Sequence, residues 1–144
     1  MLSDSERSLL LEELARRPRG LADSFTHEAT LTTPACGDTV TVRLTLDPAS
    51  SEMQEVSWDG HGCTVSMAAS AAMCALPLTD VPSFGMLHGA YTDSVGGGAV
   101  LEGDLLADLE PFAGIGRFPL RAQCATLAWR TLASAIDVGA VPQV

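Results

Sequence analysis

Lysine is absent from this chain, and basic residues of any kind are few. All eight basic residues are arginines, whereas 18 residues are acidic, so the formal net charge is −10. A surface with this charge repels the phosphates of nucleic acids and the headgroups of anionic lipids. The composition therefore excludes nucleic acid and anionic membranes as expected partners.

Long hydrophobic runs are missing as well. The most apolar stretch, residues 67–78, has about a dozen residues, whereas a membrane-spanning helix needs about 20. The N-terminal residues lack the basic start of a secretory signal, and Glu12 and Glu13 interrupt the first run of leucines. We therefore expect a soluble, cytoplasmic protein that makes no membrane contact.

Cysteine is too scarce for a disulfide scaffold, because the 144 residues include only four. In a reducing compartment, so few thiols more often bind a metal or act as nucleophiles. The chain has the length of one domain, and its apolar content of 47% is sufficient for a hydrophobic core. We expect residues 1–144 to form a single domain with a short N-terminal helix.

Alternating apolar residues predict two strands in the first half of the chain. Apolar and polar side chains alternate over residues 39–46, which is the period of a half-buried strand. A second strand is expected at residues 53–59, between a turn at 47–51 and the glycine-containing loop 60–62. The short connection predicts that these strands pair antiparallel.

Helical patterns account for most of the remaining chain. A helix capped by Ser3 or Ser5 is expected to end near Arg17, where proline and glycine follow. Further helices are expected at residues 63–75, from 79 or 80 to 96, at 105–112 and at 119–136. The predicted fold class is therefore α+β, with a small antiparallel sheet packed against several helices.

Three of the four cysteines have the local setting that a metal-binding thiol needs. Cys36 and Asp38 flank a glycine, so one turn can direct both side chains at one point. Cys63 opens a predicted helix and Cys124 lies in the first turns of another, where the positive helix end favours a thiolate. Three thiolates and a carboxylate would form a tetrahedral Zn²⁺ site. The spacing alone fits three ordinary, partly buried cysteines equally well, because no CxxC or HExxH motif is present.

Cys74 does not fit such a site. It follows Cys63 by eleven residues on the same predicted helix, which separates the two by about 16 Å along the helix axis. We interpret Cys74 as a small, buried apolar residue between Met73 and Ala75.

Three sequence blocks carry a resemblance to a known family. They are residues 33–38 (TPACGD), 60–70 (GHGCTVSMAAS) and 118–129 (FPLRAQCATLAW). In order and approximate spacing they resemble the signature blocks of the IscU/NifU N-terminal family of iron-sulfur cluster assembly proteins. The long segment before Cys124, and Gln123 where a histidine is usual, resemble the SufU branch of that family.

The resemblance implies a Zn²⁺ site formed by Cys36, Asp38, Cys63 and Cys124. It further implies that Cys36 leaves the metal and accepts sulfur, as a persulfide, from a SufS-type cysteine desulfurase, while a histidine of the desulfurase takes its place. Arg121 matches an arginine at the partner-facing rim. The protein would then be a sulfurtransferase-like sulfur acceptor rather than a stand-alone enzyme, and would work with downstream iron-sulfur assembly proteins.

Two alternatives use the same four ligands. One is a scaffold on which an iron-sulfur cluster is assembled, although Gln123 and the long middle segment favour sulfur transfer. The other is a structural zinc domain without a transfer role. The pair Cys36 and Asp38 argues against that alternative, because a carboxylate is a weaker zinc ligand than a thiolate and keeps the site exchangeable.

The remaining candidates have simple interpretations. His61 is expected to be an exposed loop residue, and His27 and His88 are expected on the surface. Arg121 is either an ordinary surface residue or a cation that steadies a thiolate or persulfide, or pairs with a partner's carboxylate. Both tryptophans are expected to pack in the core or at its edge.

Overall fold

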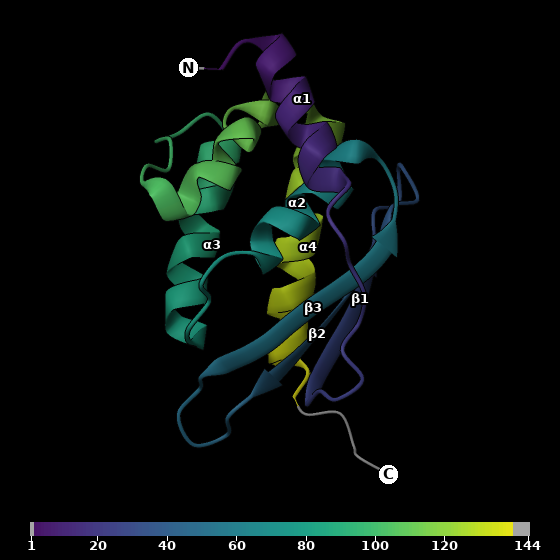
Figure 1. Ribbon diagram of the computed structural model, residues 1–144, viewed down its shortest axis with the longest axis vertical. Coiled ribbons are helices and arrows are strands. Elements are labelled where there is room, and N and C mark those ends of the chain that lie inside the picture. Colours follow the sequence, from purple (N-terminus) through teal and green to yellow (C-terminus); the bar gives the residue numbers. More distant parts are fainter. Residues whose placement is uncertain (1, 140–144) are drawn as a thin grey trace.

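The computed structural model, which describes residues 2–139, places a three-stranded antiparallel sheet against a layer of helices (Figure 1). The predicted α+β class is confirmed. The strands, in the spatial order β1-β2-β3, are β1 (His27–Thr32), β2 (Thr39–Leu46) and β3 (Met53–His61). The helices are α1 (Asp4–Ala15), α2 (Thr64–Cys74), α3 (Val81–Val95) and α4 (Pro119–Asp137), with 3-10 helices η1 (Asp104–Phe112) and η2 (Ile115–Arg117).

The two predicted strands and their antiparallel pairing are confirmed. β2 spans the predicted residues, and its inward side chains Val40, Val42 and Leu44 are fully buried. β3 continues beyond its predicted end because His61 still pairs with Thr39 of β2. β2 therefore begins just after the loop that holds Cys36, and β3 ends just before Cys63.

β1 is a strand that the sequence patterns did not predict. Its core-facing side chains are His27, Ala29 and Leu31. Two of these three positions therefore lack the large apolar residue by which a half-buried strand is recognised. The strand is defined by its antiparallel partner, from the pair His27 and Leu44 to the pair Thr32 and Thr39. A pattern this weak becomes recognisable only when the neighbouring strand is known.

The histidines differ in part from expectation. The prediction that His27 lies on the surface was wrong: it is 7% exposed, its Nδ1 lies 2.7 Å from Oγ1 of Thr26, and burial lowers the pKa of its imidazole. His88 is partly buried, with its ring stacked on Phe84 at a centroid distance of 5.5 Å. His61 is exposed, as expected.

Local signals fix the starts of the helices. Ser3 and Glu6 form a capping box at α1, in which each side chain accepts a hydrogen bond from the other residue's backbone N–H. Asp80 caps α3 by accepting a hydrogen bond from the N–H of Ser83, and Pro82 lies in the first turn. Within residues 2–139, no helix has both the length and the apolar character needed to span a membrane.

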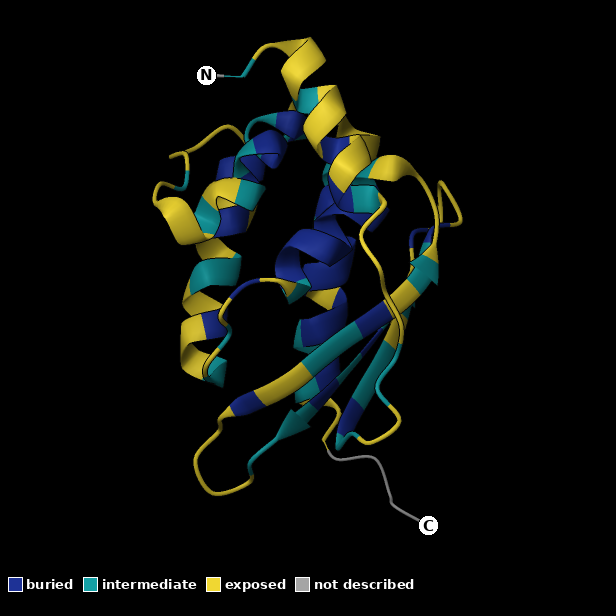
Figure 2. Ribbon diagram, in the orientation of Figure 1, coloured by how far each residue is buried: buried dark blue, intermediate teal, exposed yellow. Residues whose placement is uncertain are grey.

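α4 occupies the centre of the fold. It packs against β1 and β2 on one side and against α2 and α3 on the other, and its buried residues extend from Cys124 to Ala135 (Figure 2). Trp129 of α4 is fully buried and stacks on Tyr91 of α3, with ring centroids 4.4 Å apart. Trp58 of β3 is also buried, so the packing role predicted for both tryptophans is confirmed. This core holds Cys124 of α4 in a fixed place beside the sheet.

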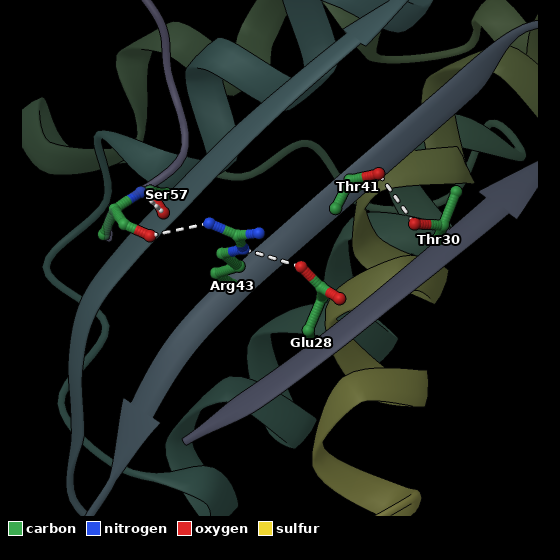
Figure 3. Close-up of polar contacts among 6 residues, drawn as sticks. Glu28, Thr30, Thr41, Arg43 and Ser57 are labelled. Carbon is green, nitrogen blue, oxygen red and sulfur yellow. Dashed lines mark hydrogen bonds and ion pairs between the residues drawn. The ribbon is translucent and has the colours of Figure 1, made fainter. Parts of the chain in front are cut away.

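The outer face of the sheet is polar, and its contacts set the register of β1 on β2. Nε of Arg43 lies 2.6 Å from Oε2 of Glu28 on the neighbouring strand, and the hydroxyls of Thr30 and Thr41 lie 2.7 Å apart (Figure 3). These cross-strand pairs fix where the loop of residues 33–38 leaves β1 and enters β2.

Candidate metal centre

Three potential ligands gather where the loop between β1 and β2 meets the N-terminal parts of α2 and α4. A carboxylate oxygen of Asp38 and the sulfur atoms of Cys63 and Cys124 all lie within 4.8 Å of one another. Asp38 and Cys124 are buried, at 4% and 3% exposure, whereas Cys63 is exposed. Because the three residues come from a loop, a helix cap and a second helix, only the folded chain brings them together.

The loop of residues 33–38 is closed at its base by Thr33 and Asp38. The N–H of Thr33 donates to the carbonyl of Asp38 at 2.8 Å, and the N–H of Asp38 donates to Oγ1 of Thr33 at 3.1 Å. Gly37 has a φ of +71°, which glycine adopts without steric cost, and its N–H donates to the carbonyl of Thr33. Asp38 is therefore held firmly at the entry to β2.

Cys36 lies on the exposed turn of this loop, two residues before Asp38. Its sulfur is not part of the cluster formed by Asp38, Cys63 and Cys124. The structure thus brings together three of the four predicted ligands and leaves the fourth on a neighbouring turn. The roles of Cys36 as a ligand and as the sulfur-accepting thiol stay predictions.

Cys63 is the N-cap residue of α2, in agreement with the prediction that it opens a helix. Its sulfur accepts a hydrogen bond from the N–H of Ser66 at 3.5 Å. The first turn of α2 contains no acidic residue that would offset the positive helix end. The sulfur of Cys63 therefore lies at the positive N-terminal end of α2, beside the other two ligands.

Cys124 lies near the start of α4 with its thiol turned toward Asp38. Its S–H donates to Oδ2 of Asp38, with the sulfur 3.3 Å from the oxygen. Burial raises the pKa of the Cys124 thiol, and the neighbouring Cys63 and Asp38 raise it further, against a lowering effect of Ser66. The thiol therefore carries a proton in the metal-free site, and metal binding would release it.

Asp38 is the acceptor at the centre of the cluster. Burial acts to raise the pKa of its carboxyl group, but hydrogen bonds with Ser66, Cys63 and Cys124 outweigh it, so the pKa lies below its usual value. A buried carboxylate that stays ionised and faces two thiols is well suited to bind a cation.

Two residues of this site were missed by the sequence analysis. Ser66 is fully buried, and its hydroxyl donates to Oδ2 of Asp38. Gly62 leaves room for the same carboxyl group, because a Cβ at that position would lie 2.6 Å from Cγ of Asp38. A sequence signal existed for Ser66, which is the third residue after a cysteine in a helix-cap position, but none existed for the contact with Gly62.

The donor set fits zinc. Thiolates and a carboxylate are ordinary Zn²⁺ ligands, and zinc in proteins usually takes four ligands in a tetrahedron. Asp38, Cys63 and Cys124 provide three, so the fourth would come from Cys36 or from another molecule.

Cys74 and Arg121 are not part of the cluster. Cys74 is at the opposite end of α2 from Cys63 and packs against the core, where burial raises the pKa of its thiol to about 12. It cannot share a metal with Cys63, as its helical spacing predicts. Arg121 is exposed in the first turn of α4, with its guanidinium 5.0 Å from the ring centroid of Phe118.

Comparison with known proteins identifies the family to which these residues belong. Residues 14–79 match the NifU-like N-terminal domain. The chain is also 31% identical over 100 residues to the zinc-dependent sulfurtransferase SufU of Bacillus subtilis (strain 168), which covers 69% of this chain and 67% of that protein. The chain belongs to the NifU-like N-terminal family.

One further relative and one solved structure are similar to this chain. The iron-sulfur cluster assembly scaffold protein IscU of Streptococcus pyogenes serotype M1 is 30% identical over 123 residues, covering 78% of this chain and 70% of IscU. The crystal structure of the SUF-system protein FiSufU from Fervidobacterium islandicum AW-1 has a TM-score of 0.76 at 20% identity, covering 94% of this chain and 96% of FiSufU. This last likeness concerns the fold alone, and it confirms the fold that the sequence resemblance implies.

Proposed function

We propose that this protein is a zinc-dependent sulfur acceptor in iron-sulfur cluster assembly, which receives persulfide sulfur from a SufS-type cysteine desulfurase. Residues 1–144 would act as one functional domain, and the sulfur would pass to downstream assembly proteins. One observation carries the proposal: three ligands are gathered and held by hydrogen bonds, while Cys36 lies exposed on the adjacent turn. The relative SufU of Bacillus subtilis, which is described as a zinc-dependent sulfurtransferase, supports it.

The residues divide naturally into a fixed set and a reactive one. Cys63 and Cys124 belong to helices, and Asp38 is tied to Thr33 at the base of its loop. Cys36 has no such anchor, because it is on a turn, so its side chain can change position at little cost in folding energy. Zinc bound at this site would keep the nearby thiols deprotonated without redox chemistry of its own.

The transfer itself is balanced without an added oxidant or reductant. The thiolate of Cys36 attacks the terminal sulfur of the desulfurase persulfide, and a new sulfur-sulfur bond forms on Cys36. The sulfur-sulfur bond of the desulfurase breaks, and the desulfurase cysteine leaves as a thiolate. One such bond is formed and one is broken, so the products are a Cys36 persulfide and a free desulfurase thiol that can start another cycle.

The edge of α4 supports a protein partner at this site. Phe118 and Leu120 lie two residues apart at the start of α4 and are 45% and 54% exposed. Arg121 follows Leu120 in the first turn of α4, and no carboxylate in the described residues forms an ion pair with it. We assign Arg121 to the partner-facing rim, where its cation can pair with a carboxylate of the desulfurase or steady a persulfide.

The second candidate function is a scaffold for an iron-sulfur cluster. The similarity to the IscU scaffold of Streptococcus pyogenes favours it, and the same thiols and carboxylate could ligate iron. Elemental analysis of protein purified without added metal separates the two. About one zinc per chain and no visible absorbance supports sulfur transfer, whereas iron with labile sulfide supports the scaffold.

Desulfurase turnover tests the proposed function. A SufS-type desulfurase with cysteine as substrate should turn over faster when this protein is added, because the protein removes the persulfide that limits the next cycle. Cys36→Ala should abolish the stimulation. Cys74→Ala is the matched control and should keep it, since Cys74 lies at the far end of α2. A desulfurase that is indifferent to the wild-type protein would contradict sulfur transfer.

A further inference from the structure

Ser66 is a buried hydroxyl residue at the junction of the three metal ligands. It lies in the first turn of α2 with no exposed surface. Its hydroxyl donates to Oδ2 of Asp38, and its backbone N–H donates to the sulfur of Cys63. Its own carbonyl accepts a hydrogen bond from the hydroxyl of Ser70 at 2.8 Å, which fixes this turn of the helix. One residue therefore contacts ligands that come from two separate elements.

The hydroxyl of Ser66 has one hydrogen, so it can serve one acceptor at a time. That hydrogen is given to the carboxylate of Asp38, while the sulfur of Cys63 receives the backbone N–H instead. The contact of 3.4 Å between Oγ of Ser66 and the sulfur of Cys63 then needs the thiol as donor. Alanine at position 66 would consequently remove the side-chain donor to Asp38 and leave the backbone donor to Cys63 in place.

The donors to Asp38 differ in what happens to them when a metal is bound. Cys124 donates through its S–H, and a thiol must lose that proton to become a metal ligand. A serine hydroxyl keeps its hydrogen at any ordinary pH. The hydroxyl of Ser66 is therefore the described side-chain donor to Asp38 that is not itself a candidate metal ligand, and the backbone N–H of Cys63 is a further donor.

We infer that Ser66 is a positioning residue of the metal site, which holds the Asp38 carboxylate in its binding orientation through a single hydrogen bond from α2. This inference rests on the metal-binding part of the proposed function, and it does not depend on sulfur transfer. Residues that hydrogen-bond to metal ligands in this way commonly contribute about 10- to 100-fold to metal affinity.

Ser66→Ala should therefore weaken Zn²⁺ binding by about 10- to 100-fold, measured by competition with a chromophoric chelator. The visible spectrum of the Co²⁺-substituted protein should change as well, since its ligand-field bands respond to the place of the carboxylate. Thr131→Val is the matched control, because it also removes a fully buried hydroxyl, but one of α4 that bonds to the backbone carbonyl of Leu127. It should keep the zinc affinity and the Co²⁺ spectrum of the wild type.

A double-mutant cycle asks whether Ser66 acts through Asp38. If it does, Ser66→Ala should change zinc affinity little in an Asp38→Ala background, although it weakens binding in the wild type. Ser66→Thr, which keeps the hydroxyl, should restore most of the affinity. Equal losses of affinity in both backgrounds would overturn the inference, and so would wild-type zinc affinity and Co²⁺ spectrum in folded Ser66→Ala.

These outcomes are independent of the outcome for sulfur transfer. Zinc affinity and the Co²⁺ spectrum are measured without a desulfurase. If the wild-type protein bound zinc with the predicted dependence on Ser66 but failed to stimulate a desulfurase, the positioning role would stand and the transfer role would fall.

Discussion

Replacing Gly62 by alanine tests whether the exact place of the Asp38 carboxylate controls metal binding. The added Cβ would lie 2.6 Å from Cγ and 2.8 Å from Oδ1 of Asp38. Since non-bonded carbon atoms rest at about 3.5 Å or more, the carboxyl group would have to move by about 0.9 Å. Asp38 cannot yield freely, because Thr33 holds its backbone and Ser66 holds its carboxylate.

Two effects of Gly62→Ala follow from this displacement. Metal sites tolerate ligand displacements of only about 0.5 Å, so zinc affinity should fall by about 10-fold or more. The metal-free protein should also lose about 1 to 3 kcal/mol of unfolding free energy, because an overpacked atom forces its neighbours to shift. Chelator competition measures the first effect, and urea unfolding of the metal-free protein measures the second.

Gly85→Ala is the control for this substitution. Gly85 is exposed in α3, and nothing lies within 4 Å of the Cβ that alanine would add. Alanine there should increase stability by about 0.5 to 1 kcal/mol through helix propensity and leave zinc affinity unchanged. A folded Gly62→Ala protein with wild-type zinc affinity would show that the position of the Asp38 carboxylate does not control metal binding.

Two further predictions concern the cysteines. Cys63→Ser and Cys124→Ser should each release zinc and lower the melting temperature of the zinc-loaded protein, because a bound metal would join two helices and a loop. Unchanged zinc content in both variants would remove these residues from the site. Burial raises the pKa of Cys74 from 9.0 to about 12, so the neutral thiol stabilises the folded state fully below pH 9, and this contribution is lost as the pH rises toward 12. Between pH 8 and pH 10 the wild type should therefore lose about 1 kcal/mol more unfolding free energy than Cys74→Ala, as measured by urea denaturation. If the unfolding free energies of the two proteins changed in parallel with pH, the Cys74 thiol would not be buried in this way.

Elements with a strong period of their own could be predicted from the sequence. Val40, Val42 and Leu44 alternate with polar residues, and a strand with one buried face requires this pattern. β1 could not be predicted in the same way, because buried His27 and small Ala29 take the places of two large apolar residues. Its identity as a strand comes from pairing with β2, which is a property of the fold.

The candidate site divides along a similar line. Asp38, Cys63 and Cys124 could be proposed from sequence because their residue types and local settings have a direct chemical meaning. Ser66 and Gly62 contribute to the site because the start of α2 lies close to the loop of residues 33–38, where both contact Asp38. This proximity results from the packing of α2 and β3 and is not encoded by any local pattern.

The central claim is that Cys36, and no other thiol of this chain, receives the sulfur. The most direct measurement is a single turnover of the zinc-loaded protein with a SufS-type desulfurase and cysteine, followed by alkylation, digestion and mass spectrometry of all four cysteine-containing peptides. We predict the mass of one added sulfur atom on the Cys36 peptide alone. Added sulfur on the peptide of Cys63, Cys74 or Cys124, or on none of the four, would contradict it.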